Sequence, residues 1–106
     1  MTDIAKGSTN VYEDIGLSDA AGMQVKAALV AKVAEIMKDR NLTQVQAAVI
    51  LGMSQPKLSA VLRGQFRGIS ETKLIDCMNR LGRDVEIVVR SPTRLRRSGR
   101  TRVVFA

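Results

Sequence analysis

Side chains able to hydrogen-bond gather in one short stretch of the chain, between Ser54 and Ser59. Gln55 offers an amide, Lys57 an ammonium group and the two serines a hydroxyl each. Groups of these types pair with the donors and acceptors along the edges of DNA bases. Ser54, Gln55, Lys57 and Ser59 are therefore the candidates for contacts to bases, and a solvated helix face is the alternative interpretation of the same residues.

A second set of residues is suited to phosphate. Gln44 stands where a helix is expected to start, and the unpaired backbone N–H groups at such a start attract anions. Thr43 directly precedes it. Arg63 and Arg67 carry permanent charges and follow the candidate base-contacting stretch. We assign these four residues to phosphate contacts, with solvated surface as the alternative for the two arginines.

Two short helices are expected to position these side chains. Thr43 and Gln46 have the spacing of a capping box, which predicts a helix beginning near Gln44. That helix is expected to end at Leu51 and Gly52, because glycine readily adopts the left-handed conformation that reverses the chain. Ser54 is a suitable cap for the next helix, whose first turn tolerates a proline at position 56.

Residue sizes in this pair of helices fit a helix-turn-helix that spans Gln44 to Arg63. Ala48 is small where the two helices would cross, and Gly52 occupies the turn. Apolar residues occupy the positions expected to face the core: Ala47, Leu51, Met53, Leu58 and Val61. We take Ala48, Gly52, Leu58 and Val61 as the packing residues of a motif that presents its second helix to the major groove of DNA. An ordinary helical hairpin is the alternative, since capped helices joined by glycine occur in many folds.

Further helices are predicted on both sides of this pair. Val25, Leu29, Val33 and Ile36 are separated by four, four and three residues, which predicts a helix over roughly residues 20–40. Residues 64–68 are expected to form a glycine-bounded loop. Ser70 then caps a fourth helix that ends at Gly82, giving four helices in all.

After Gly82 the pattern changes to the period of a β-strand. Val85, Ile87 and Val89 alternate with charged residues, apart from one further valine, and predict a strand over residues 84–90. A lone strand leaves its backbone groups unpaired, and residues 103–105 are the other strand-like run. Either the two runs form a hairpin or a second copy supplies the partner. We favour dimerisation, because the polar and basic stretch between the runs has no tight-turn signal. The expected fold is all-α with one C-terminal β-strand.

Length and charge indicate the domain organisation. A chain of 106 residues suits one small domain, and its net charge of +7 suits a polyanionic partner. Residues 1–22 hold one lysine and four acids, a balance of −3, whereas residues 91–106 hold five arginines and no acid, a balance of +5. We therefore expect a flexible acidic arm over residues 1–19, a DNA-binding domain over 20–90 and a flexible basic tail over 91–106.

Composition argues against several other classes of protein. The chain has no histidine and one cysteine, Cys77, so we expect no zinc cluster, other metal site, cofactor or internal disulfide. Cys77 lies on the apolar side of a helical pattern and is expected in the core. Scattered carboxylates and the lack of a recognisable nucleophile and base indicate that the protein is not an enzyme. No segment resembles a membrane span or secretory signal, so we expect a cytoplasmic protein. RNA binding is a distant alternative, because Tyr12, Phe66 and Phe105 are the only aromatic residues available for base stacking.

Several stretches resemble a known family. The sequence is similar to helix-turn-helix regulators of the Cro and phage-repressor (XRE) type, and within them to HigA-like antitoxins. Residues 10–17 (NVYEDIGL) look like the opening of those antitoxins and residues 81–90 (LGRDVEIVVR) like their closing strand, with residues 42–44 and 54–59 matching between them. The resemblance covers about residues 10–90, and the tail beyond Ser91 lies outside it.

The resemblance implies a lambda-repressor-like bundle that acts as a sequence-specific transcriptional repressor. Two copies would place their recognition helices in successive major grooves of a palindromic operator. It also implies a partner toxin of the RelE or HigB type and repression of a shared operon, with a stand-alone phage-like repressor as the alternative. The acidic arm is either a toxin contact or a solvated segment. The basic tail either follows phosphates, enters a minor groove or is disordered.

Overall fold

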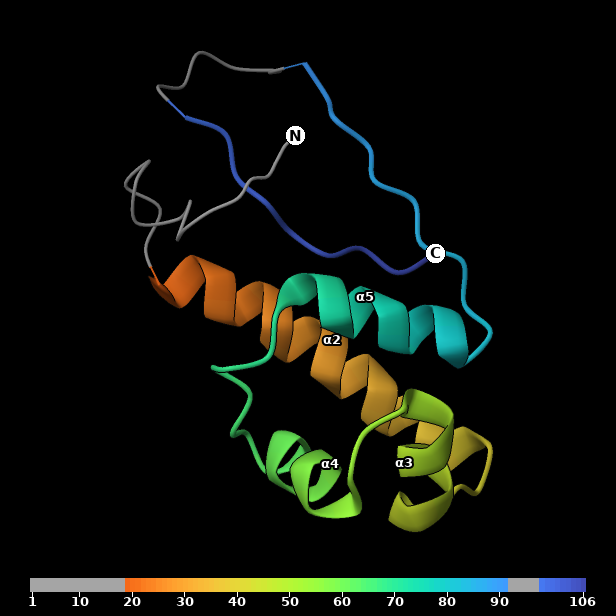
Figure 1. Cartoon of the computed structure of the whole chain (residues 1–106). Coiled ribbons are helices and arrows are strands. Elements are labelled where there is room, and N and C mark those ends of the chain that lie inside the picture. Colours follow the sequence, from red (N-terminus) through yellow and green to blue (C-terminus); the bar gives the residue numbers. More distant parts are fainter. Residues whose placement is uncertain (1–18, 92–97) are drawn as a thin grey trace.

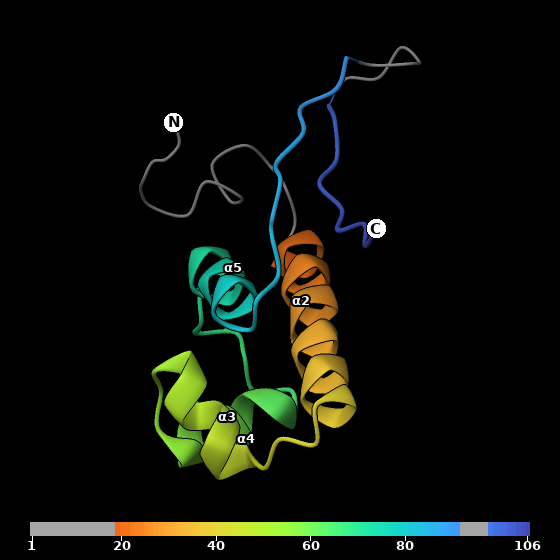
Figure 2. The same cartoon turned by 90° about the vertical axis from the view of Figure 1, so that its right-hand side faces the viewer.

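Four helices form the body of the protein, and a computed structural model describes residues 19–91 and 98–106 of the chain (Figure 1). The helices are α2 (Asp19–Asp39), α3 (Gln44–Leu51), α4 (Gln55–Leu62) and α5 (Glu71–Arg80). Helix α5 packs along α2, while α3 and α4 lie together at one end of the body (Figures 1 and 2). The four predicted helices are therefore confirmed. The acidic arm up to residue 18 and residues 92–97 of the basic tail lie outside the described residues.

Side-chain caps explain where the helices begin. Thr43 and Gln46 form the expected capping box: the Thr43 Oγ1 accepts from the Gln46 N–H at 3.1 Å, and the Gln46 Oε1 accepts from the Thr43 N–H at 2.9 Å. Ser54 accepts from the Lys57 N–H at the start of α4, and Ser70 accepts from the Lys73 N–H at the start of α5. Each cap satisfies a backbone donor that the helix itself leaves unpaired.

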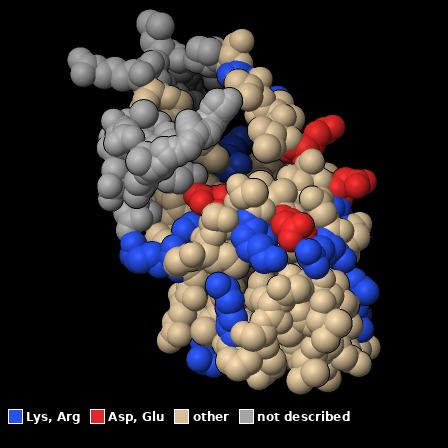
Figure 3. Space-filling view, in the orientation of Figure 1, with Lys and Arg blue, Asp and Glu red and all other residues tan. Residues whose placement is uncertain are grey.

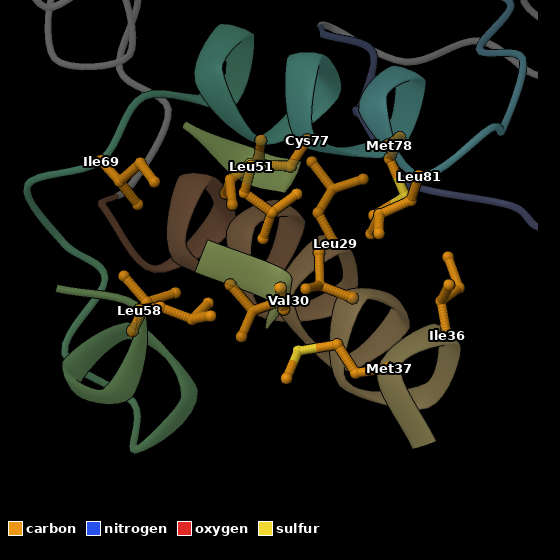
Figure 4. Close-up of a cluster of buried hydrophobic side chains, with 14 of the residues drawn as sticks. Leu29, Val30, Ile36, Met37, Leu51, Leu58, Ile69, Cys77, Met78 and Leu81 are labelled. Carbon is orange, nitrogen blue, oxygen red and sulfur yellow. The ribbon is translucent and has the colours of Figure 1, made fainter. Parts of the chain in front are cut away.

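The hydrophobic core joins all four helices (Figure 4). Helix α2 contributes the predicted stripe of Val25, Leu29, Val33 and Ile36, all of which are buried. The five largest fully buried side chains come from every helix of the bundle: Ile36, Leu51, Leu58, Leu74 and Cys77. Burying a leucine-sized side chain contributes about 1.5–3 kcal/mol. The core therefore fixes α3 and α4 onto the α2–α5 pair, and the prediction that Cys77 is a core residue is confirmed.

The predicted C-terminal β-strand is wrong for the described part of the chain. Residues 82–91 run on from α5 without strand structure, and so do residues 98–106 (Figure 1). The alternation of Val85, Ile87 and Val89 is a local pattern, but a strand also needs a ladder of backbone hydrogen bonds to a neighbour. Among the described residues, no backbone hydrogen bond joins the two segments. The fold over these residues is therefore all-helical.

The end of the chain returns to the body at α2. Val103 packs against the hydrophobic core, and the Lys32 ammonium lies 4.9 Å from the centre of the Phe105 ring, a cation–π distance. This segment lies at the end of the body away from α3 and α4 (Figures 1 and 2). None of the described helices is both long and apolar enough to cross a membrane.

Candidate nucleic-acid interface

The turn between α3 and α4 is closed by backbone hydrogen bonds around Gly52. Gly52 adopts φ 68°, in the left-handed region, and its N–H donates toward the carbonyls of Ala48 and Val49. The Met53 N–H donates to the Ala48 carbonyl at 3.1 Å. An L side chain is strained at such a φ, which explains why glycine occupies the turn. Ala48 is buried directly beneath it, where a small residue permits close packing.

Helix α4 has one buried side and one outward side. Leu58 and Val61 enter the core, whereas Gln55, Pro56 and Lys57 are exposed. Ser59 and the neighbouring Ala60 are half-buried. The core thus holds the helix by its inner side and leaves the amide of Gln55 and the ammonium group of Lys57 accessible at its N-terminal end.

A side-chain hydrogen bond joins the two helices of the motif. The Gln55 Nε2 donates to the Gln44 Oε1 at 2.9 Å. The sequence pattern indicates phosphate for Gln44 and bases for Gln55, and the structure brings the two side chains together. A carboxamide has two N–H donors and two acceptor lone pairs. The shared bond uses one donor of Gln55, so its carbonyl oxygen and second N–H, and the N–H groups of Gln44, remain for a ligand.

The hydroxyl groups of Thr43, Ser54 and Ser59 are already engaged, each as an acceptor. Thr43 and Ser54 accept the backbone N–H bonds of the helix caps. Ser59 accepts from the Arg63 Nη1 at 2.6 Å, which holds the guanidinium group against α4. Because a hydroxyl is also a donor, each of the three retains an O–H for a base or a phosphate oxygen.

Charge around the motif is of one sign. From residue 40 to residue 70 the sequence contains four cationic residues and no acidic one: Arg40, Lys57, Arg63 and Arg67. In the view of Figure 3 the end of the body formed by α3 and α4 shows blue side chains and no red ones. The loop that carries Arg67 is fixed by the Lys26 Nζ, which donates to the Arg67 carbonyl at 2.8 Å. This surface is suited to a polyanion.

Two residues of α5 that the sequence pattern did not indicate reach the end of α3, and a third residue joins them. The Lys73 Nζ donates to the Leu51 carbonyl at 3.2 Å, and the Arg80 Nη1 donates to the Ile50 carbonyl at 3.3 Å. Asp76 lies between the two cations, with its Oδ2 at 3.4 Å from Lys73 and 2.9 Å from Arg80. The hydrogen bond from Arg80 lowers the pKa of Asp76 below its ordinary value. A cation–acid–cation spacing of three and four residues on one helix face is the signal that points to this cluster.

Two of the predicted groups do not join the interface. Val85, Ile87 and Val89 are exposed along the segment that follows α5, away from α4. Arg100 and Arg102, which the structure describes from the basic tail, are exposed in the segment that packs on α2 at the opposite end. Within the described ranges, no cluster of acidic or cysteine side chains suits a metal ion.

Comparison with known proteins places the chain in a family. A family model described as "Helix-turn-helix domain" matches residues 11–90. The fold is similar to that of a solved structure named "Putative XRE Family Transcriptional Regulator", with a TM-score of 0.78 and 37% sequence identity over 84% of this chain and 100% of the other. No curated protein gives a significant match. The chain therefore belongs to the helix-turn-helix family of XRE-type transcriptional regulators.

Proposed function

We propose that the protein is a sequence-specific repressor that binds double-stranded operator DNA through α4, in the cytoplasm. The observation that carries this proposal is the exposure of Gln55 and Lys57 on a short helix whose other side is locked into the core. A fixed helix with an outward amide and ammonium group fits a major groove. The absence of acidic residues from position 40 to position 70 removes repulsion between this surface and phosphate.

Each proposed contact follows from the groups that the fold leaves available. Gln55 and Lys57 would read base edges directly, and Ser54 and Ser59 would donate their hydroxyl protons to bases. The phosphate contacts would come from Gln44 and Thr43 at the start of α3 and from Arg63 and Arg67 beyond α4. The Gln44–Gln55 hydrogen bond supports this division, because a phosphate held by Gln44 would fix the amide plane of its partner.

A homodimer on a palindromic operator is part of the proposal. Val85, Ile87 and Val89 are 40%, 79% and 92% exposed, an unusual amount of apolar surface for one short segment. A second copy would cover these side chains and place two α4 helices about one DNA turn, ~34 Å, apart. Sedimentation of Ile87→Arg tests this assignment, since a charge at that position opposes association. A variant that remains as dimeric as the wild type would remove these residues from the interface.

The regulated operon is proposed to encode a toxin as well. In this assignment the protein is an antitoxin that neutralises a messenger-RNA-cleaving toxin and represses the promoter of both genes. The four acidic residues among the first 22 support it, because they suit a basic partner protein. The adjacent reading frame decides between an antitoxin and a stand-alone regulator. An adjacent gene for a short basic protein that co-purifies with this chain supports the antitoxin. The absence of such a gene supports the stand-alone regulator.

Competition between DNA duplexes tests base reading. The wild-type protein is first used to select a preferred duplex from a random pool, and affinity is then measured for that duplex and for a scrambled one. Gln55→Ala and Lys57→Ala are each expected to reduce the preference by about 1–3 kcal/mol, the contribution of one good base contact. Gln24→Ala, an exposed amide on α2, and Arg83→Ala, an exposed cation after α5, are the matched controls. Equal losses on both duplexes would show that these residues do not read bases.

A further inference from the structure

We infer that Lys73, Asp76 and Arg80 form a clamp that positions the helix-turn-helix for DNA reading, with Arg80 as its main positioning residue. These three residues of α5 are called the α5 clamp below. The inference extends the proposed function, since it states which residues outside the motif set the orientation of α4. It rests on the contacts that α5 makes with the last turn of α3.

The carbonyl groups at the end of α3 show why a clamp is needed. The last four carbonyls of a helix have no acceptor role within the helix. In α3 the backbone N–H groups of Gly52 and Met53 satisfy Ala48 and Val49. The remaining two, of Ile50 and Leu51, accept from Arg80 and Lys73. All four carbonyls are therefore satisfied, two by the turn and two by α5.

Helix α3 has no cation of its own for this purpose. No basic residue occupies its last turn, where the negative end of the helix dipole favours one. Lys73 and Arg80 supply two positive charges from a different helix, 22 and 30 residues away in sequence. Asp76 bonds to both through one carboxylate oxygen and so holds the two cations at the separation of adjacent carbonyls.

The turn itself is in contact with the clamp. A Cβ added to Gly52 would lie 2.9 Å from the Arg80 Nη1. Arg80 therefore packs over the residue that reverses the chain between α3 and α4. Rotation of α3 relative to α5 would break the bond of Arg80 to Ile50. Rotation of α3 relative to α4 would separate Gln44 from Gln55, whose amides meet at 2.9 Å across the two helices. The clamp thus holds the C-terminal end of α3 to α5, and the amide pair holds its N-terminal end to α4.

Substitutions with matched charge controls test the clamp. Arg80→Met removes the guanidinium group and retains an unbranched apolar stem, and Arg83→Met removes an exposed arginine three residues further on. Asp76→Asn removes the acid that joins the two cations. Its control, Glu35→Gln, neutralises an exposed acid that pairs with Lys32 at the same three-residue spacing on α2. Each control changes the net charge as its partner does, so general attraction to DNA is matched.

Two measurements read out the result. The first is the preference of each variant for the duplex selected by the wild type over a scrambled duplex, at temperatures where every variant is folded. Arg80→Met is expected to lower this preference about three- to tenfold, because ion pairs between partly exposed side chains contribute modestly. Arg83→Met is expected to leave the preference unchanged. Loss of stability alone would lower binding to both duplexes together. Arg80→Lys, which retains a cation, is expected to recover part of the preference.

The second measurement does not involve DNA. Amide hydrogen exchange at Gly52 and Met53 is expected to be faster in Asp76→Asn than in Glu35→Gln, while exchange in the core of α2 is the same in both. An unaltered duplex preference in Arg80→Met, or unaltered exchange at the turn in Asp76→Asn, overturns the inference. A wild-type protein that selects no duplex overturns the proposed function instead, and the exchange measurement then decides the clamp by itself.

Discussion

Replacement of Gly52 by alanine is the sharpest probe of the recognition turn. The residue adopts φ 68°, where an L side chain costs about 1–2 kcal/mol. The added Cβ would also lie 2.9 Å from the Arg80 Nη1, so this guanidinium must move and weaken its 3.3 Å bond to the Ile50 carbonyl. A charge-assisted bond at this exposed position contributes about 0.2–1 kcal/mol. The expected loss of stability is therefore about 1–3 kcal/mol.

Thermal unfolding followed by circular dichroism measures this loss. For a domain of this size, each kcal/mol lowers the midpoint by about 4–8 °C. Two other glycines separate the contributions. Gly64 has φ 103° and open space around it, so alanine there introduces backbone strain without a clash. Gly68 has open space and no positive φ, so alanine is expected to be neutral or slightly stabilising.

The order of stability of the three variants tests the contact between the turn and Arg80. Gly52→Ala is expected to be the least stable, Gly64→Ala intermediate and Gly68→Ala the closest to the wild type. Combining Gly52→Ala with Arg80→Met is expected to cost less than the sum of the single changes, because the displaced group is already gone. Additive losses, or a Gly52→Ala protein as stable as Gly68→Ala, would refute a contact between the turn and Arg80.

Three further predictions concern the core and the titrating groups. Leu58→Ala is expected to lower the free energy of unfolding, measured in urea titrations, by about 2–5 kcal/mol. The half-buried control Leu62→Ala is expected to lower it by less. Equal losses of stability in the two variants would contradict the packing of α4. Burial raises the pKa of the Cys77 thiol above its ordinary 9.0. A thiol reagent at mildly alkaline pH is therefore expected to label Cys77 only as fast as the protein unfolds. Immediate labelling of the native protein would contradict the burial of this residue. The pKa of Asp76 is lowered from 3.8, so its stabilising effect is present above that value and is lost as the pH falls through the lower, folded value. The stability difference between the wild type and Asp76→Asn is therefore expected to close only in acid, and a difference that closes near neutral pH would exclude this carboxylate as its cause.

The elements that sequence predicts well are those fixed by neighbouring residues. The starts of α3, α4 and α5 follow from Thr43, Ser54 and Ser70, whose side chains bond to N–H groups three residues ahead. The core stripe of α2 follows from its helical spacing. In both cases the deciding interaction or periodicity lies within a few turns of one helix, which a local pattern describes fully.

The features that the sequence pattern predicted wrongly or did not predict depend on distant partners. Ile87 and its neighbours alternate as a strand does, yet pairing is a long-range property that the alternation does not specify. The bonds of Lys73 and Arg80 to α3 cross 22 and 30 residues, and their acceptors are carbonyl groups that every residue carries. The Gln44–Gln55 bond spans 11 residues and depends on the angle of the turn between them. Side-chain identity indicated what these residues offer, and the tertiary fold decided what they meet.

The division of labour between the two sides of the motif has a practical consequence for engineering. The side chains that hold the turn in place are supplied by α5, whereas those on the outer side of α4 support nothing in the core. Lys57 can therefore be randomised to respecify the target site of an intact protein, whereas a change at Gln55 also removes its hydrogen bond to Gln44. A peptide excised as residues 43–63, by contrast, would leave the carbonyls of Ile50 and Leu51 without their donors from α5 and the buried sides of both helices without the core.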